Sequence, residues 1–308
     1  MKPVLFTSNN SLQRAENIKA VFEAYDGEKE FIHTNPWKKD ERIGSNAYSM
    51  RVCDEFIGAS PGKAIMIGHA ISGGKTYGLD QPHPYHKRSN ARLLDFVVTS
   101  SEKMIPLVAK QSGVHERQVL PLGTPRTDVY FRVKRKKESG KRIYLYAPTF
   151  RNREETPMPM IDWRYIDERL TDEEVFIVKP HMVTKTILKG ESYRHIIEVD
   201  SQKPSIPYLV ECDVLITDYS SIMLDAHLLK VPVVLLEKAK GYLKNRGMYL
   251  PYPEGYASRY CTTERELIDV IRDADGQGIE DIACLEKTAN ACDGHATERV
   301  RDLIRSML

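Results

Sequence analysis

Short apolar runs alternate with helix-length amphipathic segments along the whole chain, and this alternation constrains the fold more than any other feature. Runs of roughly 4–8 residues rich in Val, Ile, Leu, Phe and Tyr, bounded by polar or turn residues, predict strands. Strands that alternate with helices predict parallel sheets with helices on both faces, which is an α/β fold. The expected strands are 4–7, 30–33, 55–59, 64–68, 95–101 and 118–123 in the first half, and 142–148, 175–181, 195–200, 213–218 and 231–237 in the second.

Two helices have clear signals of their own, and a third is expected near 102–112. Thr263 and Glu266 are spaced as a capping box, in which each side chain accepts the other residue's backbone N–H at the start of a helix. A helix after the first strand is predicted from apolar residues that recur at helical spacing, namely Leu12, Ala15, Ile18, Val21 and Phe22.

The length of 308 residues suits two domains of about 150 residues each. Between the two series of strands lies RVKRKKESGKR (132–142), which has seven basic residues, one acid and a Ser-Gly pair and is typical of an inter-domain linker. We therefore expect one Rossmann-like domain at 1–133 and a second at 134–290. The last segment, 291–308, is expected to form a helix that packs back on the first domain.

Composition excludes several classes of protein. Lys and Arg number 45 against 43 Asp and Glu, so the net charge is +2 and no nucleic-acid partner is expected. Five cysteines, with no CxxC pair, argue against a disulfide framework or a zinc ribbon and favour a reducing cytosol. The start MKPVLFTSNN is interpreted as a strand and not a signal peptide, and the run VPVVLL (231–236) is too short to span a membrane. We expect a cytoplasmic protein, either soluble or peripherally bound.

The segment TDYSSIMLDA (217–226) is the clearest candidate for chemistry. A buried strand ends at Asp218, and Ser220 and Ser221 follow where a helix should begin. Backbone N–H groups at a helix start, together with two hydroxyls, bind anions well. Asp225 lies one turn further along. The alternative is that one serine merely caps the helix, and the adjacent pair after Asp-Tyr favours the anion site.

A glycine-rich loop follows the strand 64–68. It contains Gly68, His69, Gly73, Gly74 and Lys75, and its glycines allow the backbone to approach a phosphate or a sugar. The segment is close to the P-loop pattern GxxxxGK[ST], but His69 stands where the first glycine belongs. The segment that follows, YGLDQPHPYHK, makes a poor helix, which argues against a P-loop because that motif opens a helix.

Three further turns carry charged or titratable side chains directly after expected strands. They place Lys179 and His181 at the end of 175–181, Arg151 after 142–148, and Arg126 after 118–123. Each residue alone is as well explained as a surface loop residue. Together with the two segments above they predict a cleft lined with anion-binding groups and two histidines, which suits transfer chemistry on a phosphorylated donor.

The residues LVECDVLITDYSSIMLDAHLLKVPVVLLE (209–237) resemble the signature of the CDP-glycerol glycerophosphotransferase family, the teichoic-acid primases and polymerases. Shorter motifs agree in order along the chain. They are GTPRTDVYF (123–131), YAPTFR (146–151), KPH (179–181), RGMYLPY (246–252) and DGHATERVRDLI (293–304). The match runs from about 64 to the end and is most specific at 123–237.

The resemblance implies a GT-B architecture, in which two Rossmann-like domains with parallel sheets face a cleft. It places the acceptor on the first domain and the nucleotide donor on the second. Family members transfer glycerol 3-phosphate from CDP-glycerol to an acceptor hydroxyl and release CMP. By motif, the acceptor-side base falls on His69, the donor-phosphate histidine on His181, and the pyrophosphate serines on Ser220 and Ser221.

Other roles follow with less support from the motifs. Arg126, Lys179 and Arg151 are predicted phosphate contacts. No cofactor or structural metal is expected, although Asp218 and Asp225 leave a catalytic Mg²⁺ open. The acceptor is either lipid-linked or a saccharide, and the polyol phosphate and the primase or polymerase mode stay open. The basic stretch 132–142 is interpreted as a linker or as a contact with the anionic inner face of the cell membrane. Alternative functions are a GT-B nucleotide-sugar glycosyltransferase and a non-catalytic binding module.

Overall fold

The computed structural model divides the chain into two compact units, each with its own parallel sheet. Unit 1 comprises Met1–Arg132 and Glu286–Leu308, and unit 2 comprises Val133–Leu285. Among the described residues, six strands form each sheet, and every pair of neighbouring strands is parallel, which confirms the predicted α/β class. The structure describes residues 2–34, 40–54, 62–68, 70–72, 93–134, 140–151, 161–184, 186–238, 243, 247–257, 259–274 and 282–308.

The sheet of unit 1 has the strand order β2-β1-β3-β4-β5-β6. The order reverses between β1 and β3, and ligands of open α/β sheets bind beyond the carboxyl ends of the strands at such a point. The strands are β1 (Val4–Ser8), β2 (Lys29–His33), β3 (Met50–Cys53), β4 (Lys63–Met66), β5 (Phe96–Val98) and β6 (Val119–Leu120).

Strand β3 is absent from the sequence prediction, and the expected strand 55–59 lies outside the described residues. Arg51 is the second residue of β3 and is completely buried, and its Nε donates a hydrogen bond of 2.9 Å to the hydroxyl of Thr7. A charged side chain interrupts the apolar run by which a buried strand is recognised. This is why the hydrophobic pattern misses β3.

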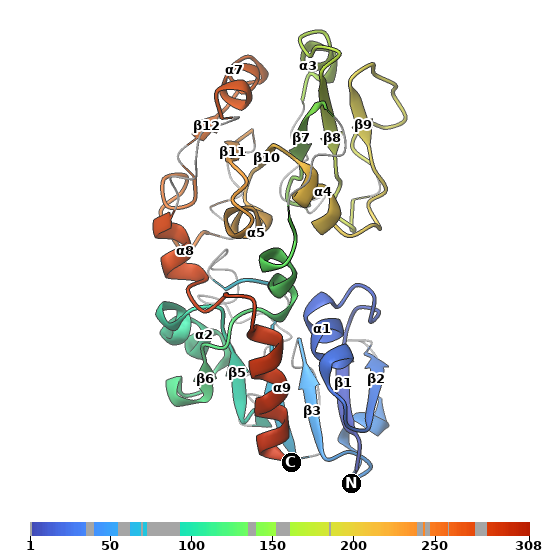
Figure 1. Cartoon of the computed structure of the whole chain (residues 1–308), viewed down its shortest axis with the longest axis vertical. Helices are drawn as coiled ribbons and strands as arrows, with labels where there is room; N and C mark the ends of the chain where they lie inside the picture. The colour runs from blue at the N-terminus through green and yellow to red at the C-terminus, as the bar shows by residue number, and fades with distance from the viewer. Residues whose placement is uncertain are drawn as a thin grey trace. The chain divides into compact units, whose positions relative to one another are not determined.

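Helix α1 (Glu16–Ala24) and helix α9 (Ala296–Met307) pack against each other on one face of this sheet (Figure 1). Ile18 and Val21 of α1 share a buried cluster with Val300 and Ile304 of α9, so the predicted apolar face of the first helix is confirmed. The other helical segments of unit 1 are η1 (Glu41–Gly44), η3 (Glu102–Met104), α2 (Ile105–Ser112), η4 (Glu116–Gln118) and η5 (Pro125–Phe131).

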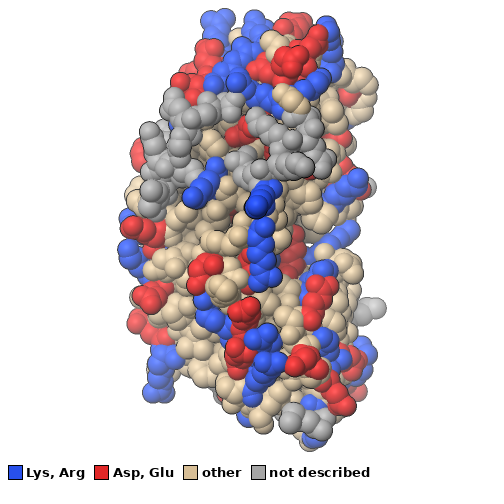
Figure 2. Space-filling model, viewed as in Figure 1, with Lys and Arg blue, Asp and Glu red and all other residues tan. Residues whose placement is uncertain are grey.

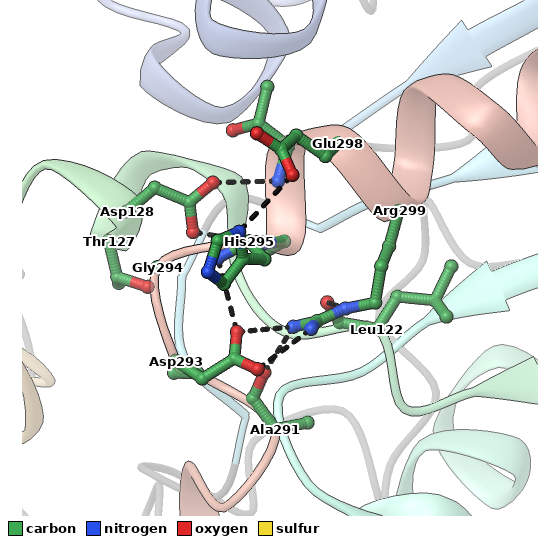
Figure 3. A network of polar contacts seen from close by, with 12 residues as sticks. Leu122, Thr127, Asp128, Ala291, Asp293, Gly294, His295, Glu298 and Arg299 are labelled. Carbon is green, nitrogen blue, oxygen red and sulfur yellow. Dashed lines mark hydrogen bonds and ion pairs between the residues drawn. The ribbon is translucent and has the colours of Figure 1, made fainter. Parts of the chain in front are cut away.

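A polar network at the start of α9 holds the end of the chain on unit 1 (Figure 3). The carboxylate of Asp128 in η5 accepts hydrogen bonds from the backbone N–H groups of Ala296 (3.0 Å) and Thr297 (2.7 Å), the first two residues of α9. Asp293 binds the guanidinium of Arg299 through two contacts of 2.8 Å. Two motifs far apart in the sequence, 123–131 and 293–304, therefore meet as one structural element.

The sheet of unit 2 has the strand order β12-β11-β10-β7-β8-β9. Counted within the unit, this is the Rossmann order 3-2-1-4-5-6, with the reversal between β7 and β10. Its strands are β7 (Arg142–Tyr146), β8 (Glu174–Val178), β9 (Ile196–Glu198), β10 (Val214–Thr217), β11 (Val233–Leu236) and the unpredicted β12 (Arg259–Cys261). The helices are α3 (Trp163–Asp167), α4 (Ile206–Glu211), α5 (Ile222–Leu228) and α7 (Glu264–Ala274), and α8 (Ile282–Thr288) spans the boundary of the two units.

The capping box predicted for α7 is confirmed. The backbone N–H of Glu266 donates to the hydroxyl of Thr263, and the N–H of Thr263 donates to the carboxylate of Glu266, each at 3.2 Å. Leu267, Ile268 and Ile271 on the same helix are buried against the sheet of unit 2.

All five cysteines lie in the described part of the chain, are buried, and form no disulfide. Burial raises the pKa of the Cys261 thiol to about 12. Within the described ranges, every helix is too short or too polar to cross a bilayer.

Candidate functional site

The predicted donor-side residues of unit 2 gather at one edge of its sheet. Strands β11, β10, β7 and β8 are consecutive neighbours and parallel, so the segments that follow them emerge on the same side. We call this the carboxyl edge of unit 2. It comprises Thr149–Arg151 after β7, Lys179–His181 after β8, Asp218–Ser221 after β10, and Glu237 after β11.

A buried ion pair joins two of these segments. The guanidinium of Arg151 contacts the Oδ2 atom of Asp218, and both side chains are almost fully buried, with 2% and 3% exposure. The Oδ1 atom of Asp218 accepts the backbone N–H groups of Thr149 (2.8 Å) and Tyr219 (2.6 Å). Arg151, a predicted phosphate contact, therefore binds Asp218, a residue of the predicted anion-binding segment 217–226. Because both carboxylate oxygens accept hydrogen bonds, a metal ion at Asp218 would compete with three donors.

Ser220 and Ser221 lie between this ion pair and helix α5. Ser221 occupies the position before Ile222, the first residue of the helix, but its side chain makes no capping hydrogen bond. The Ser220 hydroxyl lies 3.5 Å from the backbone N of Ile222, which is too long for a strong cap. Both side chains are half-buried. This geometry argues against the capping alternative and leaves two hydroxyls beside a helix start.

Asp225 is buried on α5, one turn beyond the serines. Among the described residues, no three His, Cys, Asp or Glu side chains gather into a metal site.

Lys179 is buried and bound to backbone oxygens. Its ammonium group donates to the carbonyls of Pro180 (2.9 Å) and Ser201 (3.2 Å). Burial lowers the pKa of Lys179, and the nearby carboxylate of Asp200 opposes this shift. A phosphate contact by Lys179 would require it to leave these carbonyls.

His181 is held between a ring and a backbone group. Its imidazole centroid lies 4.7 Å from that of Phe150, and its Nδ1 accepts the backbone N–H of Val183 at 3.2 Å. An Nδ1 that accepts places the proton of the neutral ring on Nε2.

Sequence reasoning did not select a tyrosine and carboxylate cluster beside the ion pair. The carboxylate of Glu237 accepts hydrogen bonds from the hydroxyls of Tyr219 and Tyr260. Tyr252 stacks against Tyr219 with ring centroids 4.9 Å apart. Burial and the bond to Glu237 raise the pKa of Tyr260 to about 12, so this phenol stays a hydrogen-bond donor. The only sequence signal was the position of Glu237 as the last residue of the predicted strand 231–237.

The predicted residues of unit 1, which are the acceptor-side loop and the phosphate contact Arg126, are described in part. Gly68 follows β4 with a φ of 64°, a conformation that favours glycine. His69, Gly73, Gly74 and Lys75 lie outside the described residues. Arg126 is the second residue of η5. Its Nη1 lies 3.5 Å from the Glu16 carboxylate and 3.4 Å from the Tyr130 hydroxyl.

Asn17 connects these segments and was also missed by sequence reasoning. Its amide Nδ2 donates to the carbonyl of Gly68 at 3.1 Å, and its Oδ1 accepts the backbone N–H of Arg126 at 2.9 Å. An asparagine within a helical pattern gives no sequence signal for such a bridge.

The fold belongs to a class of two-unit α/β proteins with parallel sheets. A solved structure of the wall teichoic acid polymerase TagF superposes with a TM-score of 0.76 at 20% identity and covers 99% of this chain and 88% of that chain. A further TagF structure was determined after a soak with CDPG.

Residues 51–306 match the family described as CDP-Glycerol:Poly(glycerophosphate) glycerophosphotransferase, and the chain belongs to this family. It is 28% identical over 272 residues to the teichoic acid ribitol-phosphate polymerase TarL of Staphylococcus aureus, covering 79% of this chain and 48% of that protein. It is 29% identical over 227 residues to the teichoic acid glycerol-phosphate primase of Bacillus subtilis, covering 68% of this chain and 59% of that protein. The chain thus spans about half the length of these curated relatives.

Proposed function

We propose that this protein transfers glycerol 3-phosphate, or a related polyol phosphate, from a CDP-activated donor to an acceptor hydroxyl and releases CMP. The observation that carries the proposal is the carboxyl edge of unit 2, where the hydroxyls of Ser220 and Ser221 lie at the start of α5, directly after the ion pair that Asp218 forms with Arg151. Family membership and the names of the relatives support a role in teichoic-acid or capsule-like polymer synthesis.

The donor diphosphate would bind to dipoles at this edge. Arg151 and Asp218 neutralise each other, and Lys179 is bound to carbonyls, so hydroxyl and N–H groups are the remaining anion ligands that the geometry favours. The serines and the first backbone N–H groups of α5 would hold the pyrophosphate. His181 would donate its Nε2 proton to the oxygen on which charge develops.

The reaction is a displacement at the phosphorus that bears the polyol. The acceptor oxygen forms a bond to this phosphorus, the bond from phosphorus to the CMP oxygen breaks, and His69 takes the acceptor proton as general base. This arrangement requires the GT-B architecture, with His69 and His181 on opposite walls of a cleft. Arg126 is a further candidate phosphate contact from unit 1.

The acceptor is proposed to be lipid-linked or a saccharide. Basic and acidic side chains are interspersed on the face of unit 1 seen in Figure 2, so the candidate membrane contact is the basic stretch 132–142 and not this face. Flotation with liposomes tests this contact. Binding to vesicles with anionic lipid, but not to vesicles without it, supports this contact. If the protein binds neither kind of vesicle, the interpretation of 132–142 as a linker remains.

The decisive experiment offers the purified protein CDP-glycerol, CDP-ribitol and UDP-sugars with candidate acceptors and measures the freed nucleotide. We expect CMP from a CDP-alcohol and no UDP from UDP-sugars. Release of UDP would favour a nucleotide-sugar glycosyltransferase, and no release from any donor would favour a binding module. Loss of the base in His69→Ala should lower kcat by about 10²–10⁴-fold, whereas unchanged turnover would remove this assignment.

A matched pair of serine variants tests the donor site. Ser221→Ala and Ser220→Ala should weaken donor binding, because each removes a hydroxyl beside α5. Ser205→Ala is the control. Ser205 also precedes a short helix of unit 2, α4, without a side-chain cap and is half-buried, but it follows β9, three strands from β10. Equal effects of the three variants would contradict the proposed donor site.

A further inference from the structure

The side chain of Asn17 bridges three segments at the carboxyl edge of the unit 1 sheet. Asn17 lies in the first turn of α1, which follows β1, and is 2% exposed. Its two hydrogen bonds reach the carbonyl of Gly68, after β4, and the N–H of Arg126, after β6. These segments are separated by 51 and 109 residues from Asn17 in the chain. One small amide therefore connects the loop that leads to His69 with the loop that carries Arg126.

The two partners differ in polarity, and this makes an amide the matching side chain. Gly68 offers a carbonyl acceptor and Arg126 offers an N–H donor. An amide has both a donor and an acceptor on one planar group, whereas a carboxylate only accepts and an aliphatic side chain does neither. A buried group left with the wrong partner loses its hydrogen bond and stays desolvated, which is unfavourable. The segment that carries this group is then expected to shift.

Both contacts fall on backbone that leads directly to candidate site residues. The Gly68 carbonyl belongs to the peptide bond that joins Gly68 to His69, and peptide units are planar and stiff. At the other end, the same turn of α1 also holds the Arg126 guanidinium, whose Nη1 lies 3.5 Å from the Glu16 carboxylate. α1 therefore fixes Arg126 through its backbone and its side chain at once.

We propose that Asn17 is a positioning residue for the transfer reaction. It holds the Gly68 carbonyl and the Arg126 backbone in the register that the acceptor side needs, without contacting the substrate itself. The inference rests on the proposed function, because it assigns Asn17 a role in that reaction. It predicts a defect in turnover that is much larger than any defect in donor binding. Asn17 and the Arg126 that it holds belong to unit 1, and Arg126 is only one of the proposed phosphate contacts, whereas the serines and His181 belong to unit 2.

The test compares three variants in the full chain with CDP-glycerol as the donor. Asn17→Asp keeps the shape and the acceptor for Arg126 but turns an anion toward the Gly68 carbonyl, and Asn17→Leu removes both bonds. Gln118→Glu is the control, because the Gln118 amide also bridges a backbone N–H, of His115 at 3.1 Å, and a backbone carbonyl, of Leu94 at 2.7 Å. Gln118 lies at the opposite, amino-terminal edge of the same sheet, before β6.

We expect kcat for CMP release to fall about 10–100-fold in both Asn17 variants, because small misplacement of catalytic groups has effects of this size. The dissociation constant for CDP-glycerol should stay within about twofold of wild type, and Gln118→Glu should keep wild-type kcat. Rates are expressed per CDP-glycerol binding site, so that unfolded protein does not count. If Asn17→Leu does not fold, Asn17→Ser replaces it, with the same expected loss.

The pH profile of Asn17→Asp separates positioning from general damage. A protonated carboxyl can supply one donor and one acceptor, which are the two bonds that the Asn17 amide makes. The kcat of Asn17→Asp relative to wild type should therefore rise as the pH falls. Burial favours the protonated form and moves this recovery to higher pH. Asn17→Leu should show no recovery. The inference would be overturned if the Asn17 variants kept wild-type kcat or lost only donor binding. In that case, CMP release by the wild type would still support the proposed function. No release by the wild type would instead overturn the proposed function, and the inference with it.

Discussion

In unit 2, buried charges join the loops at the carboxyl edge of the sheet, whereas in unit 1 a neutral amide does so. Arg151 and Asp218 connect the segments after β7 and β10, while Asn17 connects the segments after β4 and β6 to α1. A buried charge is strongly unfavourable without its partner, and an amide that loses one hydrogen bond costs much less. Loss of the residue that connects the loops is therefore expected to cost more stability in unit 2 than in unit 1.

The difference extends to the point where each strand order reverses. In unit 2 this point lies between β7 and β10 and is occupied by the pair of Arg151 and Asp218. In unit 1 it lies between β1 and β3, where the hydroxyl of Ser8 donates to the carboxylate of Asp54 at 2.7 Å. Loss of activity in variants of Arg151 or Asp218 will therefore include a large folding component, whereas the folding component in the Asn17 variants should be smaller.

The largest loss of stability is expected when the buried ion pair of unit 2 is broken. Arg151→Met should lower the free energy of unfolding by about 3–5 kcal/mol, because it leaves the Asp218 carboxylate buried without its cation. Urea denaturation followed by circular dichroism measures this loss. The double variant Arg151→Met with Asp218→Asn should recover part of it, since the asparagine oxygen still accepts the two backbone N–H groups. A loss below about 1 kcal/mol in the single variant would contradict the contrast between the units.

A second buried carboxylate makes unit 2 sensitive to acid. Burial alone would raise the pKa of Glu174, but hydrogen bonds from the guanidinium of Arg272, the backbone of Thr171 and the hydroxyl of Tyr144 outweigh it and lower this pKa to about 2. A pKa that is lower in the folded state gives stability above the unfolded value, near 4.5, and this stability is lost as the pH falls toward 2.

Glu174→Gln measures this contribution. At pH 7 the variant should lose on the order of 2 kcal/mol of unfolding free energy, and the difference from wild type should shrink between about pH 4.5 and pH 2. Urea midpoints at pH 7, 4 and 2.5 give the comparison. A difference that does not change with pH would show that Glu174 is not held as an anion by its three donors.

Much of the fold follows from hydrophobic periodicity alone. The described strands of unit 2 that were expected begin and end within three residues of their predicted positions, because both faces of a parallel sheet are covered and the strands are continuous apolar runs. The misses have physical causes. Arg51 places a charge inside β3, and β12 consists of Arg259–Cys261, which is too short and too polar to stand out.

The candidate site was predictable at the level of segments and not of contacts. Each segment chosen because it follows a strand lies at a carboxyl edge where it is described, since parallel strands all end on the same side. Whether Arg151 faces a ligand or Asp218 depends on how two loops 67 residues apart pack, which no local pattern encodes. Asn17 was missed for the same reason, because its role exists only once Gly68 and Arg126 are brought beside it.

The α9 cap tests whether unit 1 is indeed held by local hydrogen bonds of ordinary strength. Asp128→Ala removes the acceptor for the first two N–H groups of α9 and should lower the free energy of unfolding by about 1–2 kcal/mol. Asp128→Asn keeps one oxygen acceptor and should lose less. Thermal unfolding of the two variants gives the measurement, and equal losses would show that the carboxylate acts by another route.

The smallest effect is expected at the exposed side of the same network. The imidazole of His295 lies 3.2 Å from the carboxylate of Glu298, but these side chains are 63% and 50% exposed (Figure 3). Water screens such a pair, so His295→Ala should change the free energy of unfolding by less than about 1 kcal/mol. His295 and Asp128 both lie in segments that resemble motifs of the family, yet only Asp128 is buried. If His295→Ala lowered the free energy of unfolding as much as Asp128→Ala, burial would not decide the size of these effects in unit 1. If His295→Ala instead lowered CMP release at unchanged stability, His295 would have a functional role.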